Sequence, residues 1–256
     1  MRIVIKIGTS TLAHPTGHLN IRRVAGLCNP NSDIKHAGHQ VILVSSGAIS
    51  MGVGKIGLSS RPTDIPTKQA AAAVGQCELM YTYDKLFSEY NHTVAQLLIT
   101  MDDVASPKRH ENFSNTMNRL LELNALPILN ENDTVSTDEI VIGDNDTLGA
   151  IVAQSVGADL LILLSDIDGL YTADPHTHPD ARLIHHIHRL DESVYALAGL
   201  SVSGQGTGGM VTKLHAAKIC MDCGCDMVIA NGNDPANLYA ILDGEEIGTR
   251  FGEGQQ

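Results

Sequence analysis

The sequence predicts an α/β fold built on a largely parallel β-sheet. Short apolar runs alternate along the chain with longer segments in which apolar residues recur at helical spacing. This alternation is typical of βαβ units, in which a helix connects two parallel strands. Hydrophobic residues make up 43% of the 256 residues, so the chain can build a substantial core.

The apolar runs predict the strands of this sheet. Aliphatic residues dominate them, and turn-forming or polar residues lie close to their ends. The predicted strands are Arg2–Ile7, Gln40–Val44, Val94–Thr100, Leu126–Leu129, Leu160–Leu164 and Asp226–Ala230. Polar and apolar residues alternate in Val135–Ile142, which predicts a small hairpin.

The segments between these runs predict helices. Their positions are about 66–90, 107–124, 145–157, 208–222 and 234–242. Another helix should begin at Ile21, but Pro30 lies inside it, and a proline within a helix costs about 3 kcal/mol. We therefore expect this helix to end near Cys28 and to restart at Ser32 or Asp33, since serine and aspartate are good N-caps.

Charge and composition argue against several classes of protein. The formal net charge is −12, whereas a nucleic-acid-binding protein would present a basic face. No apolar run approaches the roughly 18 residues of a membrane span, and Met1 and Arg2 lead directly into a strand without a signal peptide. The five cysteines are an odd number and lack the spacing of a disulfide framework, which fits a reducing compartment. We expect a soluble cytoplasmic protein that binds neither nucleic acid nor a membrane.

Cysteines gather in the pattern Cys220-x-x-Cys223-x-Cys225. One interpretation is a metal or redox site. The other is a helix end, with Gly224 capping the helix and Cys225 opening a strand. A tetrahedral metal site needs more ligands than this pattern supplies, so the sequence favours the helix end.

The glycine-rich segment Gly204–Lys213 is the strongest indication of function. Four of its first six residues are glycine, so its backbone can wrap around an anion. A helix should begin just after these glycines, which would place Lys213 near the helix N-terminus. Backbone N–H groups, a helix N-terminus and an ammonium group together suit a polyphosphate.

Lys6 is a second lysine in an unusual setting. It lies in the otherwise apolar first strand, and Gly8, Thr9 and Ser10 follow it. In open α/β sheets ligands bind at the carboxyl ends of the strands, where this group should lie. The alternative is a lysine on an edge strand that points to solvent. Together with Lys213, Lys6 suggests phosphoryl transfer from a nucleotide.

Polar clusters also follow other predicted strands. Ser46 could bind a carboxylate or a phosphate. Asn130–Asp133 and Gly143–Asp146 bracket the predicted hairpin, and their carboxylates and amides would suit an amino acid, although one residue of the second cluster would also serve as a helix N-cap. Ser165–Pro175 is either a contact for the base and ribose of a nucleotide or an ordinary Asp-Gly turn.

Two segments, Gly52–Gly57 and Gly204–Gly209, match the glycine pattern of dinucleotide-binding proteins. Neither is followed about 20 residues later by an acidic residue that closes a second strand, as this fingerprint requires. The chain also lacks the Gly-x4-Gly-Lys-[Ser/Thr] pattern of P-loop proteins. A nucleotide would therefore be bound in another way.

Taken together, these motifs resemble the amino acid kinase family, and in detail its branch that phosphorylates glutamate. They occur in the family's order over nearly the whole chain. The matching segments are Lys6–Ser10, Ser45–Ile49, Lys68–Gln76, Asn130–Asp133, Gly143–Asp146, Asp168–Pro175 and Gly206–Lys213. Lys68–Gln76 and Thr207–Lys213 look specific to this branch rather than to acetylglutamate, carbamate, aspartate or uridylate kinases.

The resemblance implies a three-layer αβα sandwich around a mostly parallel sheet of about eight strands. It implies that ATP phosphorylates the side-chain carboxylate of L-glutamate, in the first step toward proline. A carboxylate is already a nucleophile, so catalysis needs no general base and reduces to alignment and charge neutralisation. Mg²⁺ would be held mainly by phosphate oxygens, so we expect no cluster of metal-binding carboxylates.

The resemblance also assigns roles to residues. Lys6 and Lys213 would stabilise the transferred phosphoryl group, and Asp146 would hold both lysines in place. The family's glutamate-binding positions correspond to Ser46, Asp133 and Asn145. Its nucleotide-binding positions correspond to Lys6, Ser165, Asp166, Thr207, Gly208, Gly209, Met210, Val211, Thr212 and Lys213.

The resemblance further implies one domain over residues 1–256, with a glutamate-binding lobe over about 1–157 and an ATP-binding lobe over about 158–256. Many members of the family carry a C-terminal PUA domain, and this sequence ends before one would begin. Members of the family form oligomers, which implies a homodimer or homotetramer. The resemblance also implies feedback inhibition by L-proline and transfer of the product to glutamyl phosphate reductase.

Three alternatives stay open at this point. The first is an enzyme of the same fold that acts on another acid or on a phosphate, as acetylglutamate, aspartate or uridylate kinases do. The second is a catalytically silent sensor of proline or glutamate, against which Lys6, Asp146 and Lys213 argue. The third is a dehydrogenase.

Overall fold

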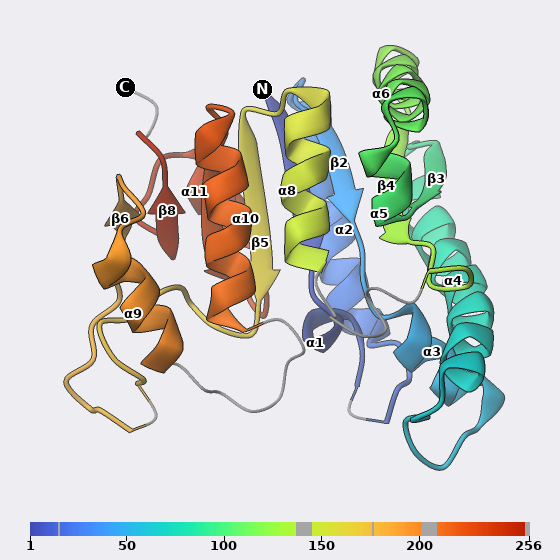
Figure 1. Ribbon diagram of the computed structural model, residues 1–256. Helices are drawn as coiled ribbons and strands as arrows, with labels where there is room; N and C mark the ends of the chain where they lie inside the picture. The colour runs from blue at the N-terminus through green and yellow to red at the C-terminus, as the bar shows by residue number, and fades with distance from the viewer. Residues whose placement is uncertain (15, 137–144, 176, 201–208, 254–256) are drawn as a thin grey trace.

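One sheet with helices on both faces forms the structure (Figure 1), a computed structural model that describes residues 1–14, 16–136, 145–175, 177–200 and 209–253. Its strands are β1 (Arg2–Ile7), β2 (Gln40–Val44), β3 (Val94–Ile99), β4 (Leu126–Glu131), β5 (Leu160–Ser165), β6 (His186–Ile187), β7 (Asp226–Asn231) and β8 (Thr249–Phe251). The strand order is β3-β4-β2-β1-β5-β7-β8-β6, and among these described strands only β7 and β8 pair in antiparallel fashion. This confirms the expected αβα sandwich with a mostly parallel sheet.

The helices lie between the strands in sequence, as βαβ units require. They are α1 (Thr9–Leu12), α2 (Ile21–His36), α3 (Ala48–Ile56), α4 (Ile65–Ser88), α5 (Met101–Ala105), α6 (Pro107–Glu122), α8 (Asn145–Val156), α9 (Glu192–Leu200), α10 (Met210–Asp222) and α11 (Asn237–Leu242). The predicted strands and the predicted helices after residue 60 are confirmed with small shifts of their ends, whereas the helices α1, α3, α5 and α9 and the strands β6 and β8 were not predicted. Most of the expected hairpin, residues 137–142, lies outside the described residues. No helix in the described ranges is long and apolar enough to cross a membrane.

The sheet separates two hydrophobic clusters, one on each face. Successive side chains of a strand point to opposite faces, so Ile3 and Ile5 pack in one cluster and Val4 in the other. The first cluster includes side chains of α2 and α4, and the second includes side chains of α8 and α10. Lys6 follows Val4 by two residues, so the same alternation turns Lys6 toward α8 and α10.

The expected break near Cys28 was wrong. α2 runs without interruption across Pro30, and neither of the expected N-caps begins a second helix. Burial of an aliphatic side chain contributes about 1.5–3 kcal/mol, and α2 buries several, including Leu27 with 1% exposed. The side-chain amide of Asn31 also donates to the carbonyl of Leu27 at 2.7 Å, in the turn that the proline disturbs. Packing therefore outweighs the local preference against helix.

Glycines let α3 and α4 touch backbone to backbone. A Cβ on Gly52 would lie 1.7 Å from the carbonyl oxygen of Ala71, and a Cβ on Gly75 would lie 1.8 Å from that of Ala48. The pattern Gly52–Gly57 thus belongs to a helix contact and not to a dinucleotide fingerprint. This contact fixes α3, which follows Ser46 and forms one wall of the site described below.

Gly75→Ala is expected to destabilise the protein by about 3 kcal/mol, because the new methyl group can be accommodated only if the two helices move apart. Urea unfolding measures this change. The matched control is Gly199→Ala in α9, where no atom lies within 4 Å of an added Cβ. There the substitution should stabilise by about 0.5–1 kcal/mol. Equal effects of the two substitutions would contradict the close contact.

The cysteine-rich segment lies at a helix end, as the second interpretation predicted. α10 ends just before Cys223, Gly224 has a φ of +74°, and Cys225 leads into β7. Cys220 and Cys225 are both buried. In the part of the chain that is described, no group of three or more His, Cys, Asp or Glu side chains could hold a metal ion.

Candidate active site

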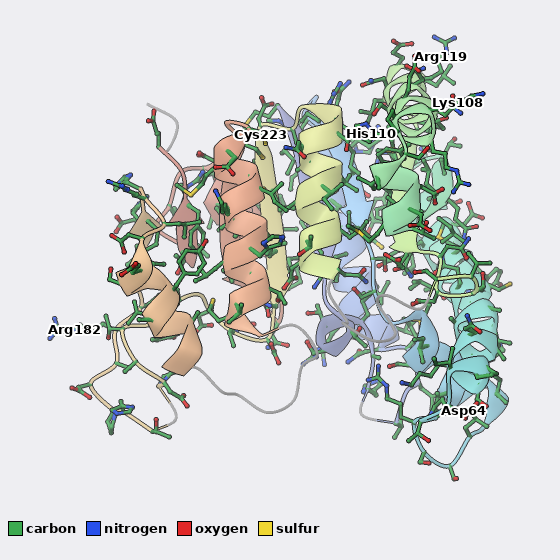
Figure 2. All side chains as sticks on the ribbon, in the orientation of Figure 1. Asp64, Lys108, His110, Arg119, Arg182 and Cys223 are labelled. Atoms are coloured by element: carbon green, nitrogen blue, oxygen red, sulfur yellow. The ribbon has the colours of Figure 1, made fainter. Side chains whose placement is uncertain are left out.

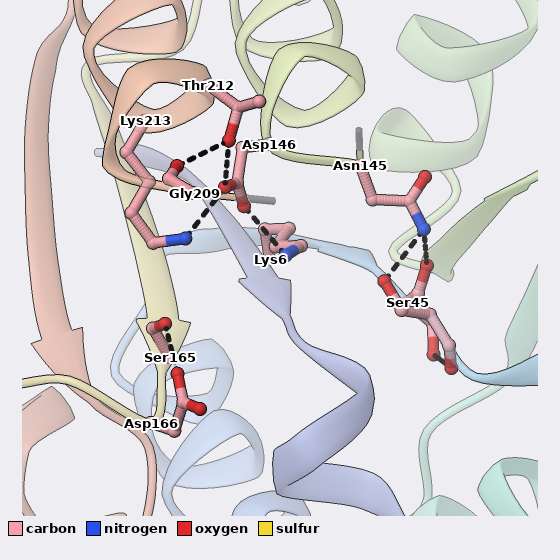
Figure 3. A network of polar contacts seen from close by, with 10 residues as sticks. Lys6, Ser45, Asn145, Asp146, Ser165, Asp166, Gly209, Thr212 and Lys213 are labelled. Carbon is pink, nitrogen blue, oxygen red and sulfur yellow. Dashed lines mark hydrogen bonds and ion pairs between the residues drawn. The ribbon is translucent and has the colours of Figure 1, made fainter. Parts of the chain in front are cut away.

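A cleft opens at the carboxyl ends of β1, β2 and β5. Its volume of about 740 Å³ lies in the usual range for small-molecule sites. The predicted site residues that line it are Lys6, Ser46, Asn145, Asp146, Ser165, Asp166 and Lys213. Figure 3, in which all of them except Ser46 are labelled, shows that these residues, although far apart in sequence, lie around the strand ends.

Lys6 reaches the cleft from the middle of the sheet. β1 pairs with both β2 and β5, and Lys6 is only 9% exposed, so it is not an edge-strand lysine that points to solvent. A Cβ on Gly149 would lie 3.4 Å from the Cβ of Lys6, which shows that the lysine stem lies against α8. Asp146 lies one helical turn before Gly149, on the same face of α8.

Asp146 binds two lysines at once (Figure 3). Its Oδ1 lies 2.7 Å from Nζ of Lys6, and its Oδ2 lies 2.9 Å from Nζ of Lys213. Burial opposes the charge of this carboxyl, but the two ammonium groups outweigh burial and hold its pKa well below the usual range. The carboxylate therefore stays ionised and fixes the two cations beside each other.

The first turn of α10 supplies Lys213 and a further contact. The hydroxyl of Thr212 lies 2.7 Å from the carbonyl oxygen of Gly209 and 3.3 Å from Oδ2 of Asp146. Met210 is buried in the core, whereas Val211 is 59% exposed. Thr207 and Gly208, the remaining predicted residues of this loop, lie outside the described residues.

Asn145 fastens α8 to the end of β2. Its side-chain amide donates to Oγ of Ser46 at 2.7 Å and to the carbonyl of Ser45 at 3.3 Å. The turn depends on Gly47, whose φ of +92° favours glycine. The Oδ1 of Asn145 is buried and has no hydrogen-bond partner among the described residues. As an amide oxygen it can accept a hydrogen bond.

Asp133 is buried beside the cleft with one oxygen unsatisfied. It is 6% exposed, and its Oδ1 has no hydrogen-bond partner in the described ranges. Burial raises the pKa of this carboxyl to about 6, although the positive charge of Arg61 lowers it. Arg61 lines the cavity, whereas Asp133 is not among the described residues that do.

Ser165 and Asp166 end β5 on the Lys213 side of the site, away from Asn145 (Figure 3). The hydroxyl of Ser165 donates to Oδ1 of Asp166 at 3.1 Å. The turn that follows is ordered by Asp168, which accepts hydrogen bonds from Tyr171 and Asn231 at 2.8 Å each.

Two residues of α4 that the sequence analysis did not assign support the strand ends. Gln76 accepts a hydrogen bond from Asn130 at 2.8 Å, and the hydroxyl of Tyr83 lies 3.1 Å from Oγ of Ser45. Both helix residues are buried two turns apart on one face. In the sequence, the signal for these two residues was a pair of polar side chains seven residues apart on an otherwise apolar helix face.

Two ammonium groups held on one carboxylate, at the carboxyl edge of a parallel sheet and next to a helix N-terminus, suit the transfer of a phosphoryl group. Fold and site thus define a kinase without a P-loop. The chain belongs to the amino acid kinase family, whose model matches residues 1–231.

Within this family the chain is similar to glutamate 5-kinases. It is 50% identical to the glutamate 5-kinase of Clostridium perfringens over 254 residues, which cover 98% of this chain and 94% of that protein. It is 52% identical to that of Symbiobacterium thermophilum over 250 residues, which cover 98% and 95%. With that of Caldanaerobacter subterraneus it shares 48% identity over 98% of this chain and 68% of the relative.

Solved structures with the same fold include more distant proteins. UMP kinase from Ureaplasma parvum superposes with a TM-score of 0.66 at 16% identity, over 98% of both chains. Isopentenyl phosphate kinase from T. acidophilum superposes with a TM-score of 0.65 at 17% identity, over 98% of this chain and 100% of that chain. At these identities the likeness concerns the fold alone.

Proposed function

We propose that the protein transfers the γ-phosphoryl group of ATP to the side-chain carboxylate of L-glutamate. The products are L-glutamyl 5-phosphate and ADP, and the reaction is the first step of proline biosynthesis. The observation that carries the proposal is the carboxylate of Asp146, which holds Lys6 and Lys213 together in the cleft. The identity of about half of the residues with glutamate 5-kinases supports the choice of substrate.

In this reaction a carboxylate oxygen of glutamate attacks the γ-phosphorus, and the bond from this phosphorus to the bridging oxygen of ADP breaks. Negative charge lies on the transferred group and the leaving oxygen throughout. Lys6 and Lys213 stabilise this charge, and Asp146 keeps them in position before the substrates arrive, so little reorganisation is needed. No proton has to be removed, because the nucleophile is already ionised.

The glutamate side of the cleft is assigned to Ser46, Asn145 and Asp133. The Oδ1 atoms of Asn145 and Asp133 have no hydrogen-bond partner among the described residues. The amide oxygen of Asn145 can accept a hydrogen bond, and the carboxylate oxygen of Asp133 suits the α-ammonium group. The lobe that contains these residues covers about 1–157 in this proposal.

The nucleotide side is assigned to Ser165, Asp166 and the residues 207–213, in a lobe that covers about 158–256. The N–H group of Thr212 donates to the carbonyl of Gly209 at 3.2 Å. The N–H groups of Met210 and Val211, which begin α10, have no acceptor within the helix and suit phosphate oxygens. Both oxygens of Asp146 are occupied by lysines, so Mg²⁺ would be held mainly by the phosphates of ATP. When bound, it would neutralise part of their charge.

The proposal also covers regulation and assembly. It includes L-proline as a feedback inhibitor, a homodimer or homotetramer in solution, and delivery of the product to glutamyl phosphate reductase. Titration of the activity with proline tests the first, and light scattering of the purified protein tests the second.

The decisive experiment is ATP-dependent formation of glutamyl hydroxamate by the purified protein in the presence of hydroxylamine. ADP release is measured in parallel with L-glutamate, N-acetyl-L-glutamate, L-aspartate and UMP. Of the four acceptors, only L-glutamate is expected to support turnover. Turnover with another acceptor in its place would overturn the choice of substrate, and no turnover with any acceptor would favour a silent sensor.

Asp133→Ala is expected to raise the KM for glutamate more than it lowers kcat, because the carboxylate binds a group that does not react. The wild-type kcat/KM for glutamate should fall as the pH drops below about 6, since the raised pKa means that Asp133 becomes protonated there. Asp133→Ala should lose this limb of the pH profile. Equal losses in kcat and kcat/KM would instead place Asp133 in the transition state.

A further inference from the structure

A glutamate molecule brings three charged groups into the cleft, and the residues assigned so far match two of them. The side-chain carboxylate faces Lys6 and Lys213 at the reacting end. The α-ammonium group would face Asp133 in this proposal. The α-carboxylate has no assigned cation, and its entry into a partly enclosed cleft without one would be costly.

The described residues that line the cleft offer few cations for this group. Lys6 and Lys213 are both paired with Asp146. The guanidinium of Arg23 donates to the backbone carbonyl of Ser10 at 3.0 Å. Arg61 is the remaining arginine of the lining, and it makes no hydrogen bond or ion pair with any described residue.

The position of Arg61 fits a contact at the amino acid end of the substrate. It is exposed in the loop between α3 and α4, and Asp64, labelled in Figure 2, ends this loop by capping α4. The same cleft wall includes Ser50 and Val53 of α3, directly beyond Ser46. The charge of Arg61 also acts on Asp133, whose pKa it lowers against the larger effect of burial. Arg61, which lines the cleft, is thus close enough to Asp133 for the two opposite charges to interact.

We infer that Arg61 binds the α-carboxylate of the substrate and that Arg61 and Asp133 together select an amino acid that carries both α-charges. This inference rests on the proposed function. The planar guanidinium can bind a carboxylate through two parallel hydrogen bonds, which a lysine cannot reproduce. Arg61 is therefore a residue of substrate specificity and not of the phosphoryl transfer.

The test compares wild type with Arg61→Ala and Arg61→Lys in the hydroxamate assay. Arg61→Ala should raise the KM for L-glutamate by about 10- to 100-fold, the effect of losing one charged hydrogen-bonding partner, and leave kcat within about threefold. The KM of Arg61→Lys for L-glutamate should lie between those of Arg61→Ala and wild type. The matched control is Arg119→Ala, which removes an exposed arginine of α6 and should leave KM unchanged. Melting temperatures establish that each variant is folded.

Two glutamate analogues identify the group that Arg61 contacts. Glutarate lacks the α-ammonium group, and 4-aminobutyrate lacks the α-carboxylate. Both analogues are tested as competitive inhibitors against L-glutamate. In Arg61→Ala the inhibition constant of glutarate should rise at least tenfold, and that of 4-aminobutyrate should not change. Asp133→Ala should give the opposite pattern.

A KM of Arg61→Ala within twofold of wild type would overturn the inference and leave the proposed function standing. An equal rise in the inhibition constants of both analogues in Arg61→Ala would also overturn the inference. If neither analogue competes with glutamate, Arg61→Lys decides: a KM below that of Arg61→Ala supports the inference, and an equal KM overturns it. A wild-type protein that forms no hydroxamate overturns the proposed function and this inference together.

Discussion

Lys213→Ala is expected to lower kcat for glutamyl hydroxamate formation by about 10²–10³-fold and to leave the KM for glutamate nearly unchanged. The lysine faces charge on the transferred phosphoryl group, and loss of one such preorganised donor typically costs a factor of this size. It would not affect ground-state binding of glutamate, which the proposal assigns to other residues. Steady-state kinetics with saturating ATP measures the two constants separately.

The matched control is Lys218→Ala on the same helix. Lys218 is exposed and pairs with Asp222 at 2.9 Å, so the substitution removes one ammonium group from α10 without touching the cleft. Its kcat should equal that of wild type. Hydroxamate formation by Lys213→Ala at the wild-type rate would show that Lys213 does not act in catalysis.

Asp146→Asn is expected to abolish most activity and to destabilise the protein by about 3–5 kcal/mol, the usual cost of breaking a buried ion pair. The amide would leave two buried ammonium groups beside each other without a counter-charge. The matched control is Asp222→Asn, an exposed carboxylate paired with Lys218, where such a pair contributes about 0.5 kcal/mol or less. Urea unfolding at pH 7 measures both changes.

The pH dependence of this difference follows from the depressed pKa of Asp146. A carboxyl whose pKa is lower in the folded state stabilises the fold fully above its unfolded value of about 3.9. That contribution is lost as the pH falls further, toward the folded pKa. The free energy of unfolding of wild type should therefore exceed that of Asp146→Asn by a constant amount between pH 5 and 8. Below about pH 4 this difference should become smaller. A difference that grows on acidification would contradict the ion-pair account.

The central strands could be predicted from the sequence because parallel strands buried on both faces are continuous apolar runs. Lys6 could be placed near the cleft because it interrupts such an apolar run near its carboxyl end. That Lys6 and Lys213 meet on Asp146 was implied by the resemblance to the family. By contrast, α3 was missed because Gly52 and Gly54 look like loop residues. In the structure Gly52 lies against the backbone of α4, and Gly54 lies against the backbone of Gly17. The continuity of α2 likewise depends on tertiary packing around Pro30.

The finer arrangement of the site also could not be predicted from the sequence. Thr212 was assigned to the nucleotide, but its hydroxyl lies 3.3 Å from Asp146. Asp133 is buried and is not among the described residues that line the cleft. Arg61 lies among serine, proline and aspartate in a loop, without a pattern that marks it. Its relation to the cleft arises only from the contact of α3 with α4.

The three charges at the centre come from residues 6, 146 and 213, which are separated by most of the chain. A polypeptide leaving the ribosome holds the first two long before the third has been synthesised. Until α10 docks, the carboxylate has one lysine and no complete centre exists. Fragments that end before α10 should therefore show no residual turnover, and the appearance of kinase activity during translation or refolding should report the final docking step.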